Sequence, residues 1–397
     1  MTLPNAVPDR RVDLDWLRIA AFGLLIFYHV GMFYVTWDWH VKSSHASTAI
    51  EPLMRASNPW RLTLLFVISG CATRFMMDKM NAGRFLGSRS VRLVLPILLG
   101  VFVIVPPQTY FQVVEQLGFS GSFGEFYGKY ATASGDWAPG GETLITPTYN
   151  HLWFVVYLFV YTLLIVPVGP LLKRIPAKLA APLASGPMVV ILPWLFLTVL
   201  LLTLRPLFPE THALIDDWYN HAVCFSAFLL GYAIAKHERF FESCQRMRWT
   251  MLGFGAGAWI ALETLRSTGS GFDDLTRQIV GGGLRELQAW ATILALFGFA
   301  RKHLRRDGPA RRYLTDAIFP FYIIHQTAIV IAGYYLNKTG MPLAIEAPLL
   351  ISITLASCWL GYEIVKRVGL LRPLFGLKLG ANRTSPAKQP QTQAASA

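Results

Sequence analysis

Apolar stretches of about twenty residues, almost free of charged side chains, recur along the whole chain. A helix rises 1.5 Å per residue, so such a stretch crosses the ~30 Å hydrocarbon core of a bilayer. The pattern therefore predicts an all-α, polytopic membrane bundle with about ten transmembrane helices. We place them at 16–36, 60–78, 92–112, 150–170, 187–205, 219–236, 249–266, 286–302, 315–336 and 346–365.

The basic residues between these segments alternate from loop to loop. With the N-terminus inside, one face holds 27 of the 36 lysines and arginines, and the other face holds 14 of the 23 carboxylates. Loops rich in Lys and Arg stay in the cytoplasm. We therefore expect both termini to be cytoplasmic.

Composition supports a membrane protein and argues against a nucleic-acid-binding protein. The chain is 53% hydrophobic and 15% charged, whereas soluble domains carry about 25% charged residues. The net charge of +13 is divided among alternate loops and forms no continuous basic patch. We therefore expect the protein to lie in a lipid bilayer. Residues 1–379 read as one transmembrane domain, and the Ala/Gln/Ser/Pro-rich residues 380–397 read as a disordered cytoplasmic tail.

Three ionisable residues share one face of the first predicted helix. At 100° per residue, Arg18 and His29 lie about 20° apart around the helix axis, and Asp15 lies about 40° from His29 on the other side. Ionisable residues at membrane depth are functional candidates by default. Alternatively, Asp15 and Arg18 are an interfacial pair, and a neighbouring helix satisfies His29.

Other candidates lie on later segments. His325 falls near the middle of 315–336, and an interhelical hydrogen bond is its alternative explanation. Arg89 and Arg92 enter the third segment three residues apart and so share a face, which suits phosphate binding as well as ordinary anchoring. His151 begins the fourth segment at the outer surface. No spacing of His and Cys predicts a metal site.

The connection from 113 to 149 is long and rich in aromatic residues, so we expect it to be ordered. Its rings would lie in the membrane interface or pack on the faces of sugars. No Asp or Glu falls in the middle of a predicted helix, which disfavours an ion-driven transporter.

Several of these residues belong to short motifs that resemble the acyltransferase 3 superfamily of membrane O-acyltransferases. The match covers nearly the whole chain, and its pieces follow the expected order. They are Asp15-x-x-Arg18 leading to His29, Phe66-Val-Ile-Ser-Gly70, Arg89-x-x-Arg92-x-x-x-Pro96, His151-Leu-Trp153 and Tyr322-Ile-Ile-His325. Trp39-His-Val-Lys-Ser43 and Tyr362-Glu-Ile are similar to the glucan-succinylating branch of that superfamily.

The resemblance implies transfer of an acyl group from cytosolic acyl-CoA to a hydroxyl of a glycan beyond the membrane, such as a periplasmic glucan. It implies a multi-pass protein of the cell inner membrane, with acyl-CoA as co-substrate and no bound cofactor or metal. Many members carry a Glu soon after His-Leu-Trp, and residues 154–161 offer none, so no role is carried over for it. The resemblance implies His29 as the catalytic residue and Arg89 and Arg92 as part of the donor site. To these we add His325 as catalytic, Asp15 and Arg18 as donor-binding, and Trp39, His40, His151 and Trp153 as acceptor-binding.

Three questions stay open at this point. The acyl group is succinyl or acetyl. It reaches His29 through a cavity open to both faces, or it crosses on an acyl-histidine or another carrier. The alternative classes are an exporter or flippase of a glycan or polar lipid, and a membrane protein that only organises partners.

Overall fold

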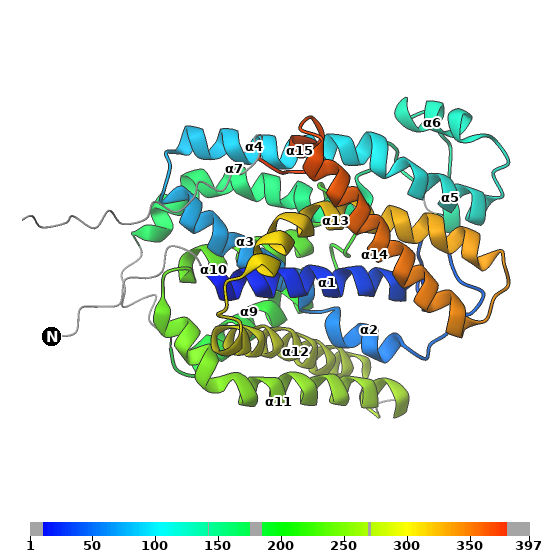
Figure 1. Cartoon of the computed structure of the whole chain (residues 1–397). Helices are drawn as coiled ribbons and strands as arrows, with labels where there is room; N and C mark the ends of the chain where they lie inside the picture. The colour runs from blue at the N-terminus through cyan, green and yellow to red at the C-terminus, as the bar shows by residue number, and fades with distance from the viewer. Residues whose placement is uncertain (1–10, 142, 175–184, 269–270, 379–397) are drawn as a thin grey trace, which may run out of the picture.

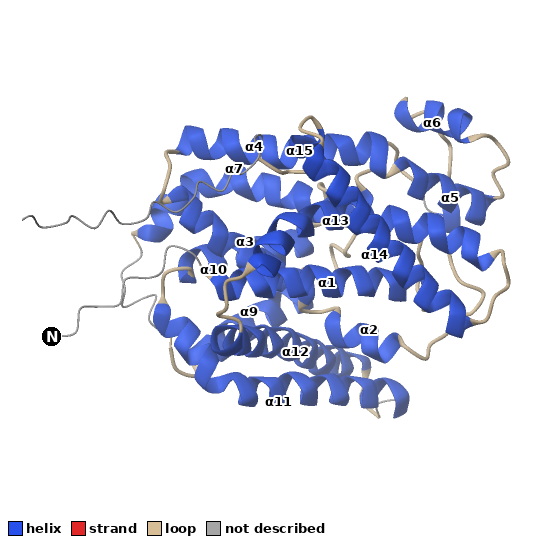
Figure 2. Cartoon of the chain, in the orientation of Figure 1, coloured by secondary structure: helices blue, strands red, loops and turns tan. Residues whose placement is uncertain are grey.

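The computed structural model describes residues 11–141, 143–174, 185–268 and 271–378, so the predicted tail at 380–397 lies outside it. Every regular element in these ranges is a helix, which confirms the all-α prediction (Figure 2). The helices are α1 Val12–Tyr34, α2 Glu51–Ser57, α3 Arg61–Met77, α4 Ala82–Leu99, η1 Gly100–Ile104, α5 Pro106–Leu117, α6 Phe123–Ala131, η2 Pro139–Gly141, η3 Asn150–Leu152, α7 Trp153–Lys173, α9 Met188–Thr203, α10 Trp218–Ile234, α11 Glu238–Thr268, α12 Asp274–His303, α13 Pro309–Asn337, α14 Leu343–Arg367 and α15 Leu371–Leu374.

All ten predicted segments coincide with helical parts of the chain. Segment 92–112 is part of a continuous helix, Ala82–Leu117, formed by α4, η1 and α5. Five helical stretches are long and apolar enough to cross a bilayer: Val12–Tyr34, Ala82–Leu117, Asn150–Lys173, Pro309–Asn337 and Leu343–Arg367. α3 and α10 are shorter, with 17 residues each, and α11 and α12 carry charged residues in their terminal turns. The chain is a multi-pass membrane protein.

The first helix, α1, runs through the middle of the bundle (Figure 1). It packs against α13, α12, α3 and α14. Leu14, Leu17, Phe22, Leu25 and Ile26 are all buried, and these residues point in several directions around the helix axis. Within α1 only Ala20 and Phe27 are exposed, so the helix is largely interior. Polar residues on α1 are therefore placed inside the protein and away from lipid.

Helices α3 and α10 approach each other through two glycines. A Cβ on Gly70 would collide with the carbonyl oxygen of Phe228, and a Cβ on Gly231 would collide with that of Val67. Small residues allow membrane helices to pack backbone against backbone. This contact fixes the position of the Phe66–Gly70 motif against α10.

The described part of the long connection after α5 is ordered, as its composition predicts. Ser122 and Glu125 form a capping box at the start of α6. Phe126, Tyr130 and Trp137 are buried together against Val113, and the Tyr130 hydroxyl donates to the carbonyl oxygen of Val101 at 2.8 Å. Most of its aromatic rings therefore pack on one another.

Candidate active site

Helix α1 lines two separate cavities at different heights. One has a volume of about 720 Å³, and Arg11, Asp15 and Arg18 contribute to its wall; we call it the basic cavity. The other has a volume of about 690 Å³ and is lined by Tyr28 and His29; we call it the histidine cavity. Asp15, Arg18 and His29, which share one face of α1, thus lie at two different cavities: the first two at the basic cavity and His29 at the histidine cavity.

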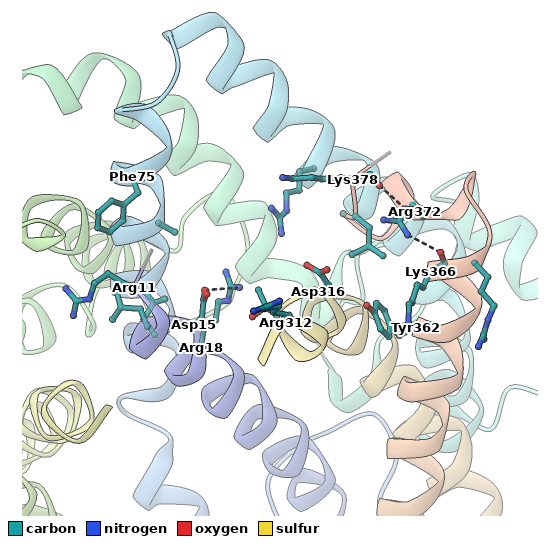
Figure 3. Close-up of a pocket in the computed structure, with 18 residues that line it drawn as sticks. Arg11, Asp15, Arg18, Phe75, Arg312, Asp316, Tyr362, Lys366, Arg372 and Lys378 are labelled. Carbon is teal, nitrogen blue, oxygen red and sulfur yellow. Dashed lines mark hydrogen bonds and ion pairs between the residues drawn. The ribbon is translucent and has the colours of Figure 1, made fainter. Parts of the chain in front are cut away.

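The basic cavity is lined by eight basic and two acidic residues (Figure 3). Its carboxylates are Asp15 and Asp316. Its cations come from α1, α4, α13, α14 and the segment after α14: Arg11, Arg18, Arg92, Arg312, Lys366, Arg367, Arg372 and Lys378. The cavity has the charge and shape to hold a polyanion, because guanidinium groups suit phosphate oxygens.

A chain of charges fixes one wall of this cavity. Asp15 accepts from Arg311 at 2.6 Å and lies 3.7 Å from Arg18. Arg311 is buried and also pairs with Asp307 at 2.8 Å. This pairing holds the pKa of Asp307 below its ordinary value. The principal partner of Asp15 is therefore Arg311, which sequence reasoning counted only as a cytoplasmic cation.

The two arginines of the Arg-x-x-Arg motif have different surroundings. Arg92 lines the basic cavity. Arg89 does not belong to the cavity wall; it is buried, and its Nε has no hydrogen-bond partner among the described residues. Of the four residues predicted to bind the donor, Asp15, Arg18 and Arg92 come together at the cavity. Lys366, Arg372 and the other added cations were recognised in the sequence only as a sign of orientation.

His29 and His325 lie against each other. His29 Nδ1 is 2.7 Å from His325 Nε2, and the two rings stack with centroids 5.0 Å apart. His325 Nδ1 lies 2.6 Å from the carbonyl oxygen of Tyr322. A carbonyl only accepts, so His325 carries its proton on Nδ1 when neutral. His325 Nε2 then accepts from His29 Nδ1.

This relay leaves His29 Nε2 as a nitrogen with a free lone pair. No described residue makes a hydrogen bond to it, and His29 lines the histidine cavity. His325 is fully buried and does not line the cavity. The geometry suits His29 to take up a proton or attack a carbon at Nε2. It suits His325 to hold the tautomer and orientation of His29.

His40 lies in a network of amide side chains. Its Nδ1 donates to Gln112 Oε1 at 2.6 Å, and its Nε2 accepts from Gln326 at 2.9 Å and Asn150 at 3.2 Å. Gln108 Oε1 accepts from the same two amides, each at 3.1 Å. Burial lowers the pKa of His40. The network therefore fits a neutral imidazole.

The other residues predicted to bind the acceptor also line the histidine cavity. Trp39 and His40 come from the loop after α1. His151 is buried; its Nε2 donates to the carbonyl oxygen of Ile323 at 3.1 Å, and its ring lies edge-on to His325 with centroids 5.4 Å apart. Trp153 packs over His212, with ring centroids 4.3 Å apart. Residues 145 and 147–150, at the end of the long connection, complete this wall.

Four aromatic side chains from four helices pack together at the level where α1 passes from the basic cavity to the histidine cavity, and two of them, Phe154 and Tyr322, also line the histidine cavity. Phe22 of α1 packs against Tyr322 of α13 and Phe154 of α7, with ring centroids 5.3 and 6.0 Å apart. Phe66 of α3 packs on Phe154 at 4.6 Å. All four are buried. On α1, Phe22 falls between Arg18 of the basic cavity and Leu25 of the histidine cavity. We call Phe22, Phe66, Phe154 and Tyr322 the aromatic partition.

Some polar residues of the histidine cavity and its amide network are not obvious in the sequence. Asn150 and Gln326 line the cavity, and Gln108 lies behind them. They are uncharged, so a search for ionisable residues at membrane depth passes over them. Arg61 also lines the cavity. Its position at the outer end of segment 60–78, on the side predicted to be poor in cations, is a usable signal. Among the described residues no group of three or more His, Cys, Asp or Glu could hold a metal ion.

Residues 11–363 match an acyltransferase domain family. Because this match covers most of the chain, the protein belongs to the acyltransferase 3 family. It is similar to the glucans biosynthesis protein C of Salmonella heidelberg (strain SL476), with 23% identity over 399 residues that cover 96% of this chain and 99% of the relative. The protein of the same name from Escherichia coli (strain K12) is 27% identical over 164 residues, which are 41% of this chain and 40% of that one. No solved structure matches the chain.

Proposed function

We propose that the protein transfers an acyl group, succinyl or acetyl, from cytosolic acyl-CoA to a hydroxyl of a glycan beyond the cytoplasmic membrane. The observation that carries the proposal is the His325–His29 relay, which presents His29 Nε2 to the histidine cavity. The acyltransferase family and relatives named for glucan biosynthesis support a glucan as acceptor. About ten spans with both termini inside would place the basic cavity at the cytoplasmic mouth.

The donor would bind at the basic cavity. Its phosphates would pair with Arg18, Arg92 and the cations of α13 and α14, which outnumber the carboxylates there. Arg89, buried and with Nε unpaired, would add positive potential behind Arg92. Eleven residues separate Arg18 from His29, a distance of ~17 Å along the helix. The acyl arm would extend along α1 and pass the aromatic partition.

The acceptor would bind in the histidine cavity, where Trp39, Trp153 and the amide network around His40 offer ring faces and hydrogen bonds to a sugar. His29 Nε2 would take the proton from the sugar hydroxyl as its oxygen attacks the thioester carbonyl carbon. The carbon–sulfur bond breaks, and the sulfur leaves as CoA thiolate, which is then protonated. The products are an ester on the glycan and free CoA.

The test is acyl transfer by the purified protein in detergent, with labelled acyl-CoA and a periplasmic-type glucan. We expect His29→Ala to lower the rate by roughly 10²- to 10⁴-fold, the usual contribution of a general base. In the same assay, Arg92→Gln should raise the KM for acyl-CoA and leave the KM for glucan unchanged. Both variants must elute as the wild-type protein does in size-exclusion chromatography.

Two outcomes would contradict the proposal. Transfer at the wild-type rate in His29→Ala would exclude this residue from the mechanism. If the wild-type protein transfers no acyl group, while cells lacking it stop exporting a glycan that is itself unmodified, the exporter alternative is favoured.

A further inference from the structure

Arg61 is a buried cation with an incomplete set of partners in the histidine cavity. The residue is 6% exposed, and two of its guanidinium nitrogens, Nε and Nη1, have no hydrogen-bond partner among the described residues. Its Cζ lies 3.3 Å from the ring centroid of Tyr28. A buried guanidinium normally has a carboxylate or several acceptors around it. Tyr28 also contributes a side-chain hydrogen bond to Arg61, but Nε and Nη1 still have no acceptor among the described residues.

The other cationic residue of this cavity, Arg285, is already paired. Arg285 lies 2.5 Å from Glu286 and 3.6 Å from Glu210. Glu210 also lies 3.6 Å from Arg205. Glu210 contributes to the field at Arg61, but it forms no ion pair with it among the described residues. Arg61 is therefore the cation of this cavity that lacks a carboxylate partner within ion-pair distance.

The position of Arg61 on its helix is also unfavourable without a ligand. It is the first residue of α3, whose N-terminus has no side-chain cap. The first N–H groups of a helix lack intrahelical partners and carry the positive end of the helix dipole. A cation at this end is destabilising, whereas an anion is stabilised by the N–H groups and by the guanidinium together. Thr63 and Asn58 also line the cavity.

We propose that Arg61 binds the free carboxylate of a dicarboxylic acyl group, of the succinyl class, while its thioester carbonyl lies at His29. This inference rests on the proposed function and decides between its two acyl groups. Tyr28 connects the two positions: its ring is 3.3 Å from Arg61 Cζ, and its centroid is 6.1 Å from that of His29. Arg61 Cζ is therefore no farther from the His29 centroid than the sum of these two distances, and an extended four-carbon acyl chain with a contact at each end can span this gap. An acetyl group would leave the Arg61 guanidinium without a ligand.

The first test compares succinyl-CoA with acetyl-CoA as donors for the wild-type protein, Arg61→Met and Arg61→Lys. We expect the wild type to prefer succinyl-CoA. Arg61→Met should lower kcat/KM for succinyl-CoA by roughly 10- to 100-fold, because a charge-assisted hydrogen-bond pair is lost, and should change acetyl transfer less than about threefold. Arg61→Lys should retain part of the preference. Arg205→Met is the matched control, since Arg205 does not line this cavity, and should keep the wild-type ratio.

A stability measurement separates a binding role from a structural role. If Arg61 serves a ligand, Arg61→Met removes an unsatisfied buried cation and should leave the Tm of the ligand-free protein equal or higher. A lower Tm together with an equal loss of succinyl and acetyl transfer would overturn the inference. An unchanged ratio of the two donors in Arg61→Met would overturn it as well.

A binding experiment tests the inference even if the protein transfers an acyl group from neither donor. Monomethyl succinate carries the free carboxylate, and methyl butyrate is a comparable ester without it. We expect monomethyl succinate, but not methyl butyrate, to raise the Tm of the wild-type protein, and neither to raise the Tm of Arg61→Met. If these Tm changes are observed but the protein transfers no acyl group, the proposed function is refuted and the carboxylate site at Arg61 is supported. Equal effects of both esters on the wild type would refute the site, even if transfer occurs.

Discussion

At the scale of single residues, His29 and His325 each supply the hydrogen bond that the other needs. A buried imidazole without partners is costly, so each histidine considered alone has an ordinary structural explanation. Together they form a directed chain from the carbonyl oxygen of Tyr322 through His325 to His29 Nδ1. The hydrogen bond between His325 and the Tyr322 carbonyl thereby determines the tautomer of His29 and leaves the lone pair on His29 Nε2. His325 is then a positioning residue.

This assignment predicts different effects for two substitutions of His325. His325→Leu removes the acceptor for His29 Nδ1–H, so His29 loses its fixed tautomer, and kcat should fall by roughly 10- to 100-fold. His325→Gln keeps an acceptor oxygen and should recover part of this loss. The KM for acyl-CoA should stay unchanged in both variants, because His325 lines neither cavity. Steady-state kinetics would check this, and equal kcat values for Leu and Gln would contradict it.

The sequence predicts some of these residues and not others for a physical reason. Helical geometry alone puts Asp15, Arg18 and His29 on one face, because the three lie on one helix. The contact of His29 with His325 joins residues that are 296 positions apart. The pairing of Asp15 with Arg311 depends likewise on how α1 meets α13. Local periodicity carries no information about such contacts, so only the residue types could be expected.

At the scale of elements, Asp78 ties three helices together at the end of the bundle where α1 begins. It accepts from Lys173 at the end of α7 at 2.6 Å, from Lys236 after α10 at 2.5 Å and from Arg74 of α3 at 3.1 Å. Burial alone would raise the pKa of Asp78, but the three donors outweigh it and hold the pKa below its ordinary value. Asp78 therefore stabilises the fold as a carboxylate.

The stability of the protein should depend on Asp78 in a pH-dependent way. A group with a lowered folded-state pKa stabilises the fold above its unfolded-state pKa, near 3.9, and loses this effect as the pH falls through the folded value. Asp78→Asn should cost about 1 kcal/mol at pH 7, allowing for solvent screening. The difference in Tm from the wild type should persist at pH 5 and narrow below about pH 4. Thermal unfolding in detergent would measure it.

The control for this prediction is Asp274→Asn. Asp274 also pairs with an arginine, Arg277 at 3.3 Å, but its side chain is 99% exposed. Its replacement should leave the Tm unchanged at every pH. Equal Tm values for the wild type and Asp78→Asn at pH 7 would show that the three cations do not need this carboxylate.

The helices were the most predictable elements. Each of the ten apolar segments lies in a helical stretch, because burial in lipid or protein requires a long run of apolar residues with satisfied backbone groups. The ends were less predictable: α11 and α12 extend well beyond 249–266 and 286–302 into charged sequence. Glu238, in the part of α11 that precedes the predicted segment, pairs with Arg301 near the end of α12 at 2.5 Å, so charged turns of the two helices stabilise each other.

At the scale of the whole molecule, the two cavities divide the protein along α1. In the proposed reaction the basic cavity holds the polyanionic part of the donor, and the histidine cavity holds the glycan acceptor together with the acyl group and its carboxylate. The aromatic partition between them consists of buried side chains from α1, α3, α7 and α13. In the structure His29 is part of the histidine cavity wall only. In the proposed reaction the acyl arm passes the partition, so side chains of the partition would have to move.

A smaller side chain in the partition should join the cavities and uncouple the reaction. Phe22→Ala removes the ring that packs on both Phe154 and Tyr322, so water and donor can meet at His29 without acceptor. We expect hydrolysis of acyl-CoA in the absence of glucan to rise several-fold, and the ratio of transfer to hydrolysis to fall. Phe22→Leu should lie between the wild type and Phe22→Ala.

The matched control is Phe297→Ala on α12. Phe297 is also buried and packs edge-on against Phe240 and Phe241, with centroids 6.2 and 5.8 Å apart, but it lines neither cavity. Both Ala variants lose a buried ring and should be destabilised by about 3–5 kcal/mol. The assays therefore belong at a temperature where both stay folded. If hydrolysis rises equally in both, loosened packing is the cause, and the partition has no role in separating donor from acceptor.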